Sequence, residues 1–114
     1  MTDCLFCAIA AGDIPATIVH EDTEVVAFRD INPQAPVHIL VIPRTHIASA
    51  ADLTPAQDDL WGRLLHVAQS LAETEGIAPD GFRVVTNVGH NGGQTVNHLH
   101  LHLLGGRAME WPPG

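Results

Sequence analysis

Histidines alternate with leucines in the segment NHLHLHLLGG, residues 97–106, and this pattern restricts the local fold more than any other in the chain. Side chains of a β-strand point alternately to opposite faces, so His98, His100 and His102 would line one face and the leucines the other. Neighbouring imidazoles would then lie within roughly 7 Å, from about 3.3 Å of rise per residue. The sequence therefore predicts a strand over residues 96–104, with a leucine face typical of a core.

An imidazole near neutral pH can act as nucleophile, proton carrier or metal ligand. A plain polar surface is the weaker interpretation of the histidine row, because solvated strand faces more often carry Thr, Lys, Glu or Ser. A structural zinc site made from all three histidines is a better rival. However, positions i, i+2 and i+4 of one flat strand rarely converge on one tetrahedral ion. We therefore expect the three histidines to have separate roles.

A glycine-rich segment, NVGHNGGQT at residues 87–95, precedes the histidine row. Its glycines allow the backbone to approach a ligand closely, and consecutive N–H groups can form an anion-binding nest. A hairpin loop that needs glycines for its turn is the alternative, and the pattern of a P-loop is absent. Because donors beside imidazoles suit attack on phosphorus, the position of the segment favours phosphate binding.

The remaining pattern predicts one long helix over residues 54–75, with Thr54 as N-cap, Pro55 at its first position and Gly76 as C-cap. Apolar residues recur along it at helical spacing. A short helix is predicted over residues 4–11, with Asp3 as its N-cap. Strands are predicted over residues 17–20, 24–29, 37–43, 82–88 and 96–104. This order predicts an α+β fold in a single domain, residues 1–114, with a mostly antiparallel sheet of about five strands, one long helix and a short N-terminal helix.

The chain has 114 residues and a formal net charge of −8, which suits one domain with an acidic surface. Such a surface repels a phosphate backbone at long range, so nucleic acid is not expected as a partner. A pocket with local donors can still bind a small anion. No apolar run approaches the roughly 20 residues of a membrane helix, and the N-terminus lacks the basic region of a secretory signal. We therefore expect a soluble cytoplasmic protein that binds no membrane.

Two cysteines, Cys4 and Cys7, stand in a C-x-x-C spacing. A cytosolic chain rarely carries a structural disulfide, so the pair is interpreted as a redox pair or as half of a zinc site. Two reduced, buried thiols are the third interpretation. The chain has eight histidines that can supply the other half of a zinc site. From the residues alone these alternatives stay open.

Three segments together resemble the histidine triad (HIT) family. The segment HLHLHLL, residues 98–104, matches the H-φ-H-φ-H-φ-φ signature of that family, where φ is apolar. FRDINPQAPVHILVIPRTHI, residues 28–47, and GGQTVNHLHLHLLGGRAMEWPPG, residues 92–114, resemble its nucleotide-binding branch, to which the terminal WPPG is particular. The resemblance implies a homodimer with the sheet and long helix described above. It also implies binding of purine nucleoside monophosphates and no organic cofactor.

The same resemblance implies a hydrolase, a purine nucleoside phosphoramidase that cleaves the P–N bond of substrates in which AMP is linked to an amine. His100, the middle histidine, would attack the α-phosphorus and form a nucleotidyl-histidine intermediate that water hydrolyses. The carbonyl of His98 would fix the tautomer of His100, and His102 would contact a phosphate oxygen. His38 would join the proton network of His102, although by itself it is equally interpreted as a satisfied histidine on a half-buried strand.

Further binding residues are implied by the matching positions. Asp30 would accept hydrogen bonds from the ribose hydroxyls, and Thr95 keeps a hydroxyl where many relatives have serine. The residues implied to enclose the base, each by itself typical of a plain core, are Phe6, Ile9, Phe28, Ile31 and Leu40. The residues implied to form the phosphate loop are Asn87, Gly93, Gln94 and Thr95.

The C-x-x-C pair resembles that of zinc-containing bacterial members of the family. In those proteins the ion takes two cysteines and two histidines, and the matching positions here are Cys4, Cys7, His46 and His98. The resemblance thus implies a closed Cys2His2 site with a structural zinc, because no position remains for a catalytic water.

Two other functions compete with the phosphoramidase. A dinucleoside polyphosphate hydrolase belongs to a neighbouring branch, against which the WPPG ending argues. A nucleotide-sensing or partner-binding protein with incidental turnover belongs to another class, and the set of His38, His100 and His102 favours catalysis over it. Trp111 and the tail are expected near the partner subunit's site, where they influence the leaving group or only stabilise the dimer. No function is expected for His20, His66 or His90.

Overall fold

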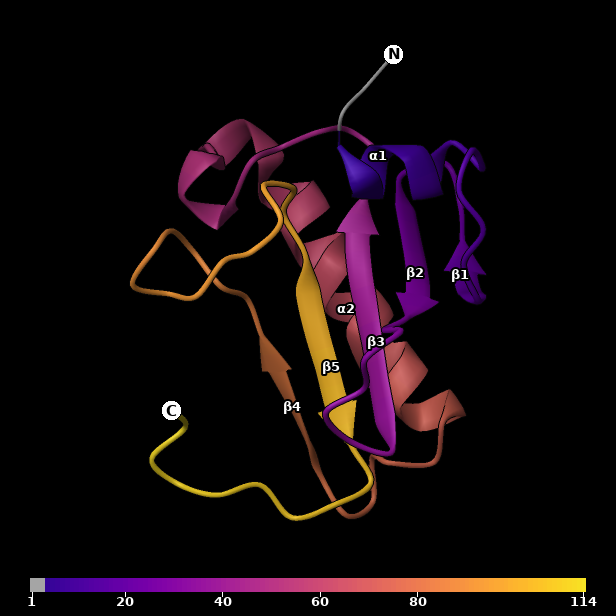
Figure 1. The fold of residues 1–114 in the computed structure, drawn as a ribbon, viewed down its shortest axis with the longest axis vertical. Coiled ribbons are helices and arrows are strands. Elements are labelled where there is room, and N and C mark those ends of the chain that lie inside the picture. Colours follow the sequence, from indigo (N-terminus) through magenta and orange to yellow (C-terminus); the bar gives the residue numbers. More distant parts are fainter. Residues whose placement is uncertain (1–3) are drawn as a thin grey trace.

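The structure is a computed structural model that describes residues 4–114. One antiparallel sheet runs through it in the strand order β1-β2-β3-β5-β4 (Figure 1). The strands are β1 (Ile18–Glu21), β2 (Val25–Arg29), β3 (Val37–Pro43), β4 (Phe82–Val85) and β5 (Leu101–Gly105). The predicted α+β class, with its five-stranded antiparallel sheet and one main helix, is confirmed.

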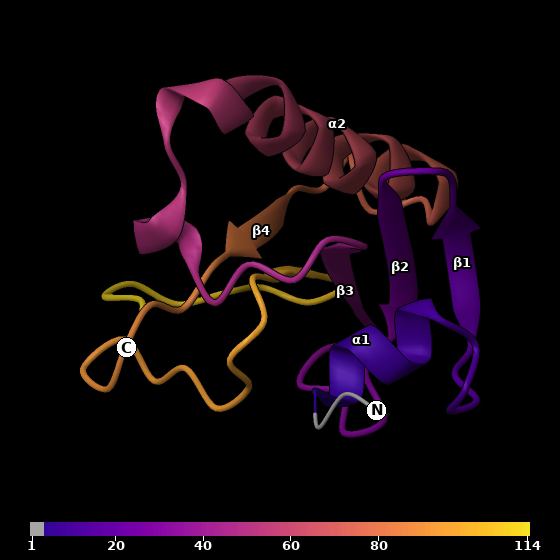
Figure 2. The same cartoon turned by 90° about the horizontal axis from the view of Figure 1, so that it is seen from above.

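The two helices lie on opposite faces of the sheet (Figure 2). The long helix α2 (Asp58–Thr74) covers one face and encloses the larger core with the leucine side of the histidine row, including Leu99, Leu101 and Leu103. The short helix α1 (Leu5–Ala10) covers the other face and encloses a smaller core around Phe6 and Phe28. The alternation of the row therefore separates two chemically different layers, with leucines toward α2 and histidines toward α1.

Local contacts explain where the helices begin and end. A 3-10 turn (Pro55–Gln57) precedes α2, so the helix begins at Asp58 and not at Pro55, and Thr54 forms a capping box with Gln57. Gly76 follows the end of α2 with a positive φ, as a C-terminal glycine does. Asp3, the predicted N-cap of the first helix, lies outside the described residues, and Cys4 is the N-cap of α1. Among residues 4–114, no helix combines the length and apolar content needed to cross a bilayer.

Two predicted strands are longer than the observed ones. The strand predicted over residues 82–88 ends at Val85, and the one predicted over 96–104 begins only at Leu101. Backbone groups between β4 and β5 make hydrogen bonds other than those of the β-sheet. The N–H of Leu99 donates to the carbonyl of Ile47 at 2.6 Å, and the Thr86 hydroxyl donates to the carbonyl of His100 at 2.9 Å. His98 and His100 thus stand on an irregular segment just before β5, and the prediction of a strand from residue 96 was wrong over residues 96–100.

Candidate active site and metal centre

A cavity of about 310 Å³ opens between α1 and the sheet. Apolar side chains form most of its wall, and two histidines of the row, His100 and His102, stand on one side of it. The structure brings nine of the predicted nucleotide-binding residues to this pocket: Phe6, Ile9, Phe28, Asp30, Ile31, Leu40, Thr95, His100 and His102. A mostly apolar cleft with a few convergent polar groups is the usual form of a small-molecule site.

The inner wall of the pocket is aromatic and its rim is apolar. The rings of Phe6 and Phe28 meet edge to face with centroids 5.4 Å apart, and both side chains are buried. Ile31, by contrast, is 99% exposed at the rim. A large apolar side chain that is fully exposed at the rim of a pocket is a candidate ligand contact.

Three predicted phosphate-loop residues, Asn87, Gly93 and Gln94, do not line the pocket. Asn87 donates to the carbonyl of Gly92 at 2.7 Å, and the Gln94 amide donates to the carbonyls of Ala48 and Val96 at 2.7 and 3.0 Å. Gly93 has a positive φ. These contacts fix the shape of the loop, and Thr95 carries the loop into the pocket wall. The role of the loop in phosphate binding stays a prediction.

Sequence reasoning missed one side of the pocket. The segment that connects α1 to β1 and the first residue of α1 contribute apolar wall, and Val96 and Arg29 lie at other edges. These additional residues are Leu5, Ile14, Pro15, Ala16, Arg29 and Val96. No periodic pattern in the sequence marks Ile14, Pro15 or Ala16 as pocket residues.

His100 is held in one defined tautomer. Its Nδ1 lies 2.7 Å from the backbone carbonyl oxygen of His98, and the side chain is 5% exposed. A carbonyl oxygen can only accept, so Nδ1 carries the proton and Nε2 keeps its lone pair. The ring of Phe6 packs edge-on against the imidazole at a centroid distance of 5.1 Å and limits its rotation. The geometry therefore presents an unprotonated ring nitrogen beside the pocket.

His38 and His102 form a directional hydrogen-bonded pair on neighbouring strands. The backbone N–H of Gln34 donates to Nδ1 of His38 at 3.0 Å, so the proton of His38 must be on Nε2. That Nε2–H donates to Nδ1 of His102 at 2.8 Å, which leaves the proton of His102 on its own Nε2. The carboxylate of Asp30 lies 3.5 Å from Nε2 of His38. His102 thus offers an N–H donor beside His100, whose ring centroid is 5.0 Å away.

Burial keeps this pair neutral. Desolvation lowers the pKa of His38, against the opposing attraction of Asp30. Burial, reinforced by the nearby rings of His100 and His38 and partly opposed by Asp30, lowers the pKa of His102 to about 4. A neutral imidazole has one donor nitrogen and one acceptor nitrogen. Because Nδ1 of His102 accepts from His38, its Nε2–H is the donor toward any anion bound next to His100.

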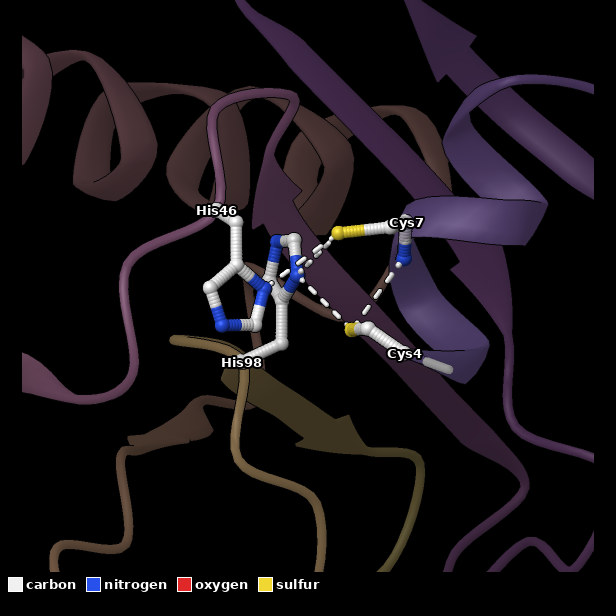
Figure 3. A group of neighbouring side chains, drawn as sticks. All are labelled: Cys4, Cys7, His46 and His98. Atoms are coloured by element: carbon white, nitrogen blue, oxygen red, sulfur yellow. Dashed lines mark hydrogen bonds between the residues drawn. The ribbon is translucent and has the colours of Figure 1, made fainter. Parts of the chain in front are cut away.

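The four predicted zinc ligands, Cys4, Cys7, His46 and His98, converge at the side of α1 (Figure 3). Cys4 is the N-cap of α1 and Cys7 lies in its first turn, the loop after β3 supplies His46, and the segment before β5 supplies His98. The hydrogen bond from Leu99 N–H to the Ile47 carbonyl draws these last two segments together. We refer to these four residues below as the metal group.

The distances within the metal group match those around a tetrahedral ion. Nδ1 of His98 lies 3.3 Å from Sγ of Cys4 and 3.5 Å from Sγ of Cys7, and Nδ1 of His46 lies 3.3 Å from Sγ of Cys7. In a zinc centre with two sulfur and two nitrogen ligands, such edges measure about 3.6 Å from the usual bond lengths. Nε2 of His98 lies 2.8 Å from the carbonyl oxygen of Pro43 and so carries the proton, which leaves Nδ1 as the donor atom for a metal.

A second cluster, Asp30, His38 and His102, also holds three metal-binding side chains within 4.8 Å. The 2.8 Å between the two imidazole nitrogens is a hydrogen-bond distance and is shorter than the N···N edge of about 3.3 Å expected around zinc. A proton and not a metal therefore joins this pair, and the metal group is the one cluster in residues 4–114 whose distances suit an ion.

Comparison with known proteins places these observations in a family. Residues 11–109 match the family described as HIT domain. The chain belongs to the HIT family. The 14 kDa zinc-binding protein of Zea mays is 50% identical over 112 residues, which cover 96% of this chain and 87% of that protein. The purine nucleoside phosphoramidase of Escherichia coli (strain K12) is 47% identical over 107 residues, which cover 94% of this chain and 90% of that enzyme.

Two further HIT relatives extend the comparison. Adenylylsulfatase HINT1 of Arabidopsis thaliana is 50% identical over 113 residues, with 96% of this chain and 76% of that protein covered. The crystal structure of a HIT family hydrolase from Legionella pneumophila Philadelphia 1 has a TM-score of 0.97 and 54% identity, covering 98% of this chain and all of that one (100%). The predicted family and the HIT fold are thereby confirmed, and the residue roles stay predictions.

Proposed function

We propose that the protein is a nucleotide-binding hydrolase that cleaves the P–N bond of purine nucleoside phosphoramidates through a nucleotidyl-His100 intermediate. The observation that carries the proposal is the 2.7 Å hydrogen bond from Nδ1–H of His100 to the carbonyl of His98, which leaves Nε2 unprotonated beside the pocket. A relative named purine nucleoside phosphoramidase supports the same chemistry. In this proposal the apolar pocket takes the base, Asp30 binds the ribose hydroxyls, and His102 donates to a phosphate oxygen.

The reaction proceeds in two balanced steps. In the first, the Nε2 lone pair of His100 forms a bond to the α-phosphorus. The P–N bond breaks with its electron pair on the amine, which takes a proton from solvent and leaves. In the second, a water oxygen attacks phosphorus, the bond to His100 breaks with its electron pair on Nε2, and the water releases a proton to solvent. The net reaction is one phosphoramidate plus water to one monophosphate plus one amine.

The hydrogen bond to His98 also stabilises the intermediate. Once phosphorus is attached to Nε2, the imidazole of His100 carries a positive charge, and its Nδ1–H becomes a charge-assisted donor to the carbonyl of His98. The Nε2–H of His102 stabilises, by hydrogen bonding, the negative charge that develops on the phosphate oxygens. The Thr86 hydroxyl donates to the carbonyl of His100 and so anchors the main chain that carries the attacking ring.

We further propose that the metal group binds a structural zinc ion. The four donors suit zinc in type and spacing, and a relative carries the name zinc-binding protein. With four protein ligands the ion has no open position for water, so its role is structural: it holds the N-terminal helix and the segment before β5 together. No step of the hydrolysis requires it.

A homodimer is part of the proposal. β4 is one of the two edge strands of the sheet, and Phe82 and Val84 on it are each 37% exposed, so this edge offers both unpaired backbone groups and apolar side chains to a second copy. The tail stays near this edge, where the ring of Trp111, 82% exposed, lies 6.0 Å from the guanidinium of Arg83. The tail is thus available to reach a partner's pocket, and light scattering of the purified protein measures the oligomeric state.

A substrate panel tests the proposed activity. It compares an adenosine phosphoramidate with a fluorogenic amine, a dinucleoside polyphosphate and adenylyl sulfate, the last because one relative is named adenylylsulfatase. We expect kcat/KM for the phosphoramidate to exceed that for the dinucleoside polyphosphate at least tenfold. A higher value for the dinucleoside polyphosphate would move the protein to the neighbouring activity. Tight AMP binding without turnover of any substrate would leave a nucleotide-sensing protein.

A further inference from the structure

Helix α1 belongs to the metal group and to the nucleotide pocket at once. Cys4 and Cys7 at its start are two of the four metal-group residues, and Phe6 stands between them in the sequence. The side chain of Phe6 is 5% exposed and lines the pocket. Its ring lies edge-on to the rings of His98 and His100, with centroid distances of 6.0 and 5.1 Å. Any displacement of the cysteines therefore moves a pocket wall that also packs against the proposed nucleophile.

His98 makes a second connection between the two sites. Its ring belongs to the metal group through Nδ1, 3.3 Å from Sγ of Cys4. Its own backbone carbonyl is the acceptor, at 2.7 Å, for Nδ1–H of His100. One residue thus touches the metal position with its side chain and sets the tautomer of the nucleophile with its main chain.

The position of α1 depends on tertiary anchors. The helix has six residues, and isolated helices shorter than about 12–15 residues are marginal in water. Apart from the metal group, the helix is attached by the packing of Phe6, Ile9 and Ala10 in the smaller core and by a hydrogen bond of 2.8 Å from Arg44 to the carbonyl of Ala10 at its C-terminal end. At the N-terminal end, the contacts of Cys4 and Cys7 with His46 and His98 add to the packing of Phe6 (Figure 3).

We propose that occupancy of the metal group and occupancy of the nucleotide pocket are coupled through Phe6, which acts as a positioning residue for His100 and the base. The inference rests on the proposed function, because it takes the pocket as a nucleotide site. A metal ion fixes the N-terminal end of α1 and with it the pocket wall, and a bound base packs against Phe6 and holds the cysteines in place. Each ligand then binds more tightly in the presence of the other.

Thermodynamic reciprocity makes the coupling quantitative. If zinc tightens AMP binding by some factor, AMP must tighten zinc binding by the same factor. We expect a factor of about ten, within the range usual for coupled sites. The AMP dissociation constant is measured by titration calorimetry on zinc-loaded and chelator-treated protein. The zinc affinity is measured by equilibrium competition with a fluorescent chelator, without AMP and with saturating AMP.

Variants locate the coupling at Phe6. In Phe6→Leu, which keeps an apolar side chain, we expect zinc and AMP to bind with a coupling factor close to one. Ile31→Ala is the matched control, because Ile31 lines the same pocket but lies outside α1 and outside the smaller core that contains Phe6. This control should weaken AMP binding in both metal states and keep the tenfold factor. Should Phe6→Leu not fold, as judged by circular dichroism, Phe6→Met takes its place.

The competition starts from zinc-loaded protein, so it gives an answer even if the metal-free chain unfolds. Unchanged zinc affinity on addition of saturating AMP overturns the coupling and leaves the hydrolase proposal intact. A coupling factor that persists in Phe6→Leu overturns the role of Phe6. If AMP fails to bind the zinc-loaded protein at all, the proposed function itself falls and the coupling with it.

Discussion

The histidines form a cluster with two ends. The metal end consists of His46 and His98, and the relay end consists of the hydrogen-bonded pair His38 and His102. The two ends use the same side chain for different chemistry. At the metal end, Nε2–H of His98 donates to the carbonyl of Pro43, and Nδ1 faces two sulfur atoms. At the relay end, Nδ1 of His38 accepts from a backbone N–H, and Nε2–H points to His102. The choice between carbonyl and amide as the backbone partner decides whether the other ring nitrogen of the neutral imidazole keeps a lone pair or carries the proton.

His100 lies between these two ends and, like His98, has a backbone carbonyl as the partner of one ring nitrogen. Its Nδ1–H donates to a carbonyl, as Nε2–H of His98 does, but the nitrogen left over is Nε2 and it lies by the pocket. Identical side chains in one cluster therefore take different roles according to the main-chain atoms that contact them.

The largest effect is expected for the nucleophile. His100→Ala should lower phosphoramidate turnover by about 10⁴-fold or more, because the covalent route loses its attacking nitrogen. AMP binding, measured by calorimetry, should persist because the apolar pocket and Asp30 remain. His66→Ala on the exposed face of α2 is the matched histidine control and should leave turnover unchanged. Turnover at the normal rate in His100→Ala would remove the covalent mechanism.

Loss of the ion at the metal end should lower the free energy of unfolding and should not change which reaction the protein catalyses. Protein purified without added metal should contain about one zinc per chain by elemental analysis, as expected for a closed Cys2His2 site. Cys4→Ser/Cys7→Ser should lose the ion and on the order of 5 kcal/mol of unfolding free energy, because a structural zinc contributes to folding directly. A metal-free preparation with undiminished stability in urea would contradict the site.

The sequence predicted the separation of the two faces but not the contacts that assign roles. Alternation placed histidines and leucines on opposite sides, and each of the long elements was located within a few residues. The pairing of His38 with His102 depends on register, because His38 lies opposite Leu104 and His102 lies opposite Leu40 in neighbouring strands. Periodicity along one strand carries no information on that offset, and only the family resemblance suggested the pairing.

The pocket wall was harder to predict than the strand beside it. Ile14, Pro15 and Ala16 line the pocket from a connection with no regular pattern, where only tertiary contacts show which side chain is covered. The glycine-rich segment shows a similar limit. Gly92 has a local reason to be glycine, since a Cβ there would overlap the backbone of Val88, and phosphate binding by this loop stays a prediction. A side chain's partner in its own loop cannot be distinguished from a ligand by composition.

Acid should protonate His102 at the relay end, and lower the stability of the fold, only well below neutral pH. An ordinary histidine titrates near 6.5, but burial and the adjacent rings lower the pKa of His102 to about 4. The unfolded chain therefore binds more protons between these values. The contribution of His102 to stability is complete above pH 6.5 and is lost as the pH falls toward 4, about 3 kcal/mol in all.

Ring nitrogen chemical shifts of His102 measure this directly. They should stay those of a neutral imidazole, protonated on Nε2, at pH 5.5. The loss of stability with falling pH, followed by urea unfolding, should be smaller in His102→Gln than in the wild type. A His102 ring that becomes charged near pH 6.5 would contradict the buried relay.

The smallest effect is expected where the relay begins. His38→Asn places its oxygen near Nδ1, so it can still accept from Gln34 N–H but cannot donate to His102. His102 then samples both tautomers, and kcat should fall about 10–100-fold, as for other residues that orient a functional histidine. His38→Gln places its amide nitrogen near Nε2, so the donor to His102 returns and kcat should stay within a few-fold of wild type. Because both amides are smaller than imidazole and equally polar, a loss of packing would lower the two alike. Equal loss in Asn and Gln would therefore reduce His38 to a structural residue, and a loss confined to Asn would show that one hydrogen bond's direction sets the work of His102.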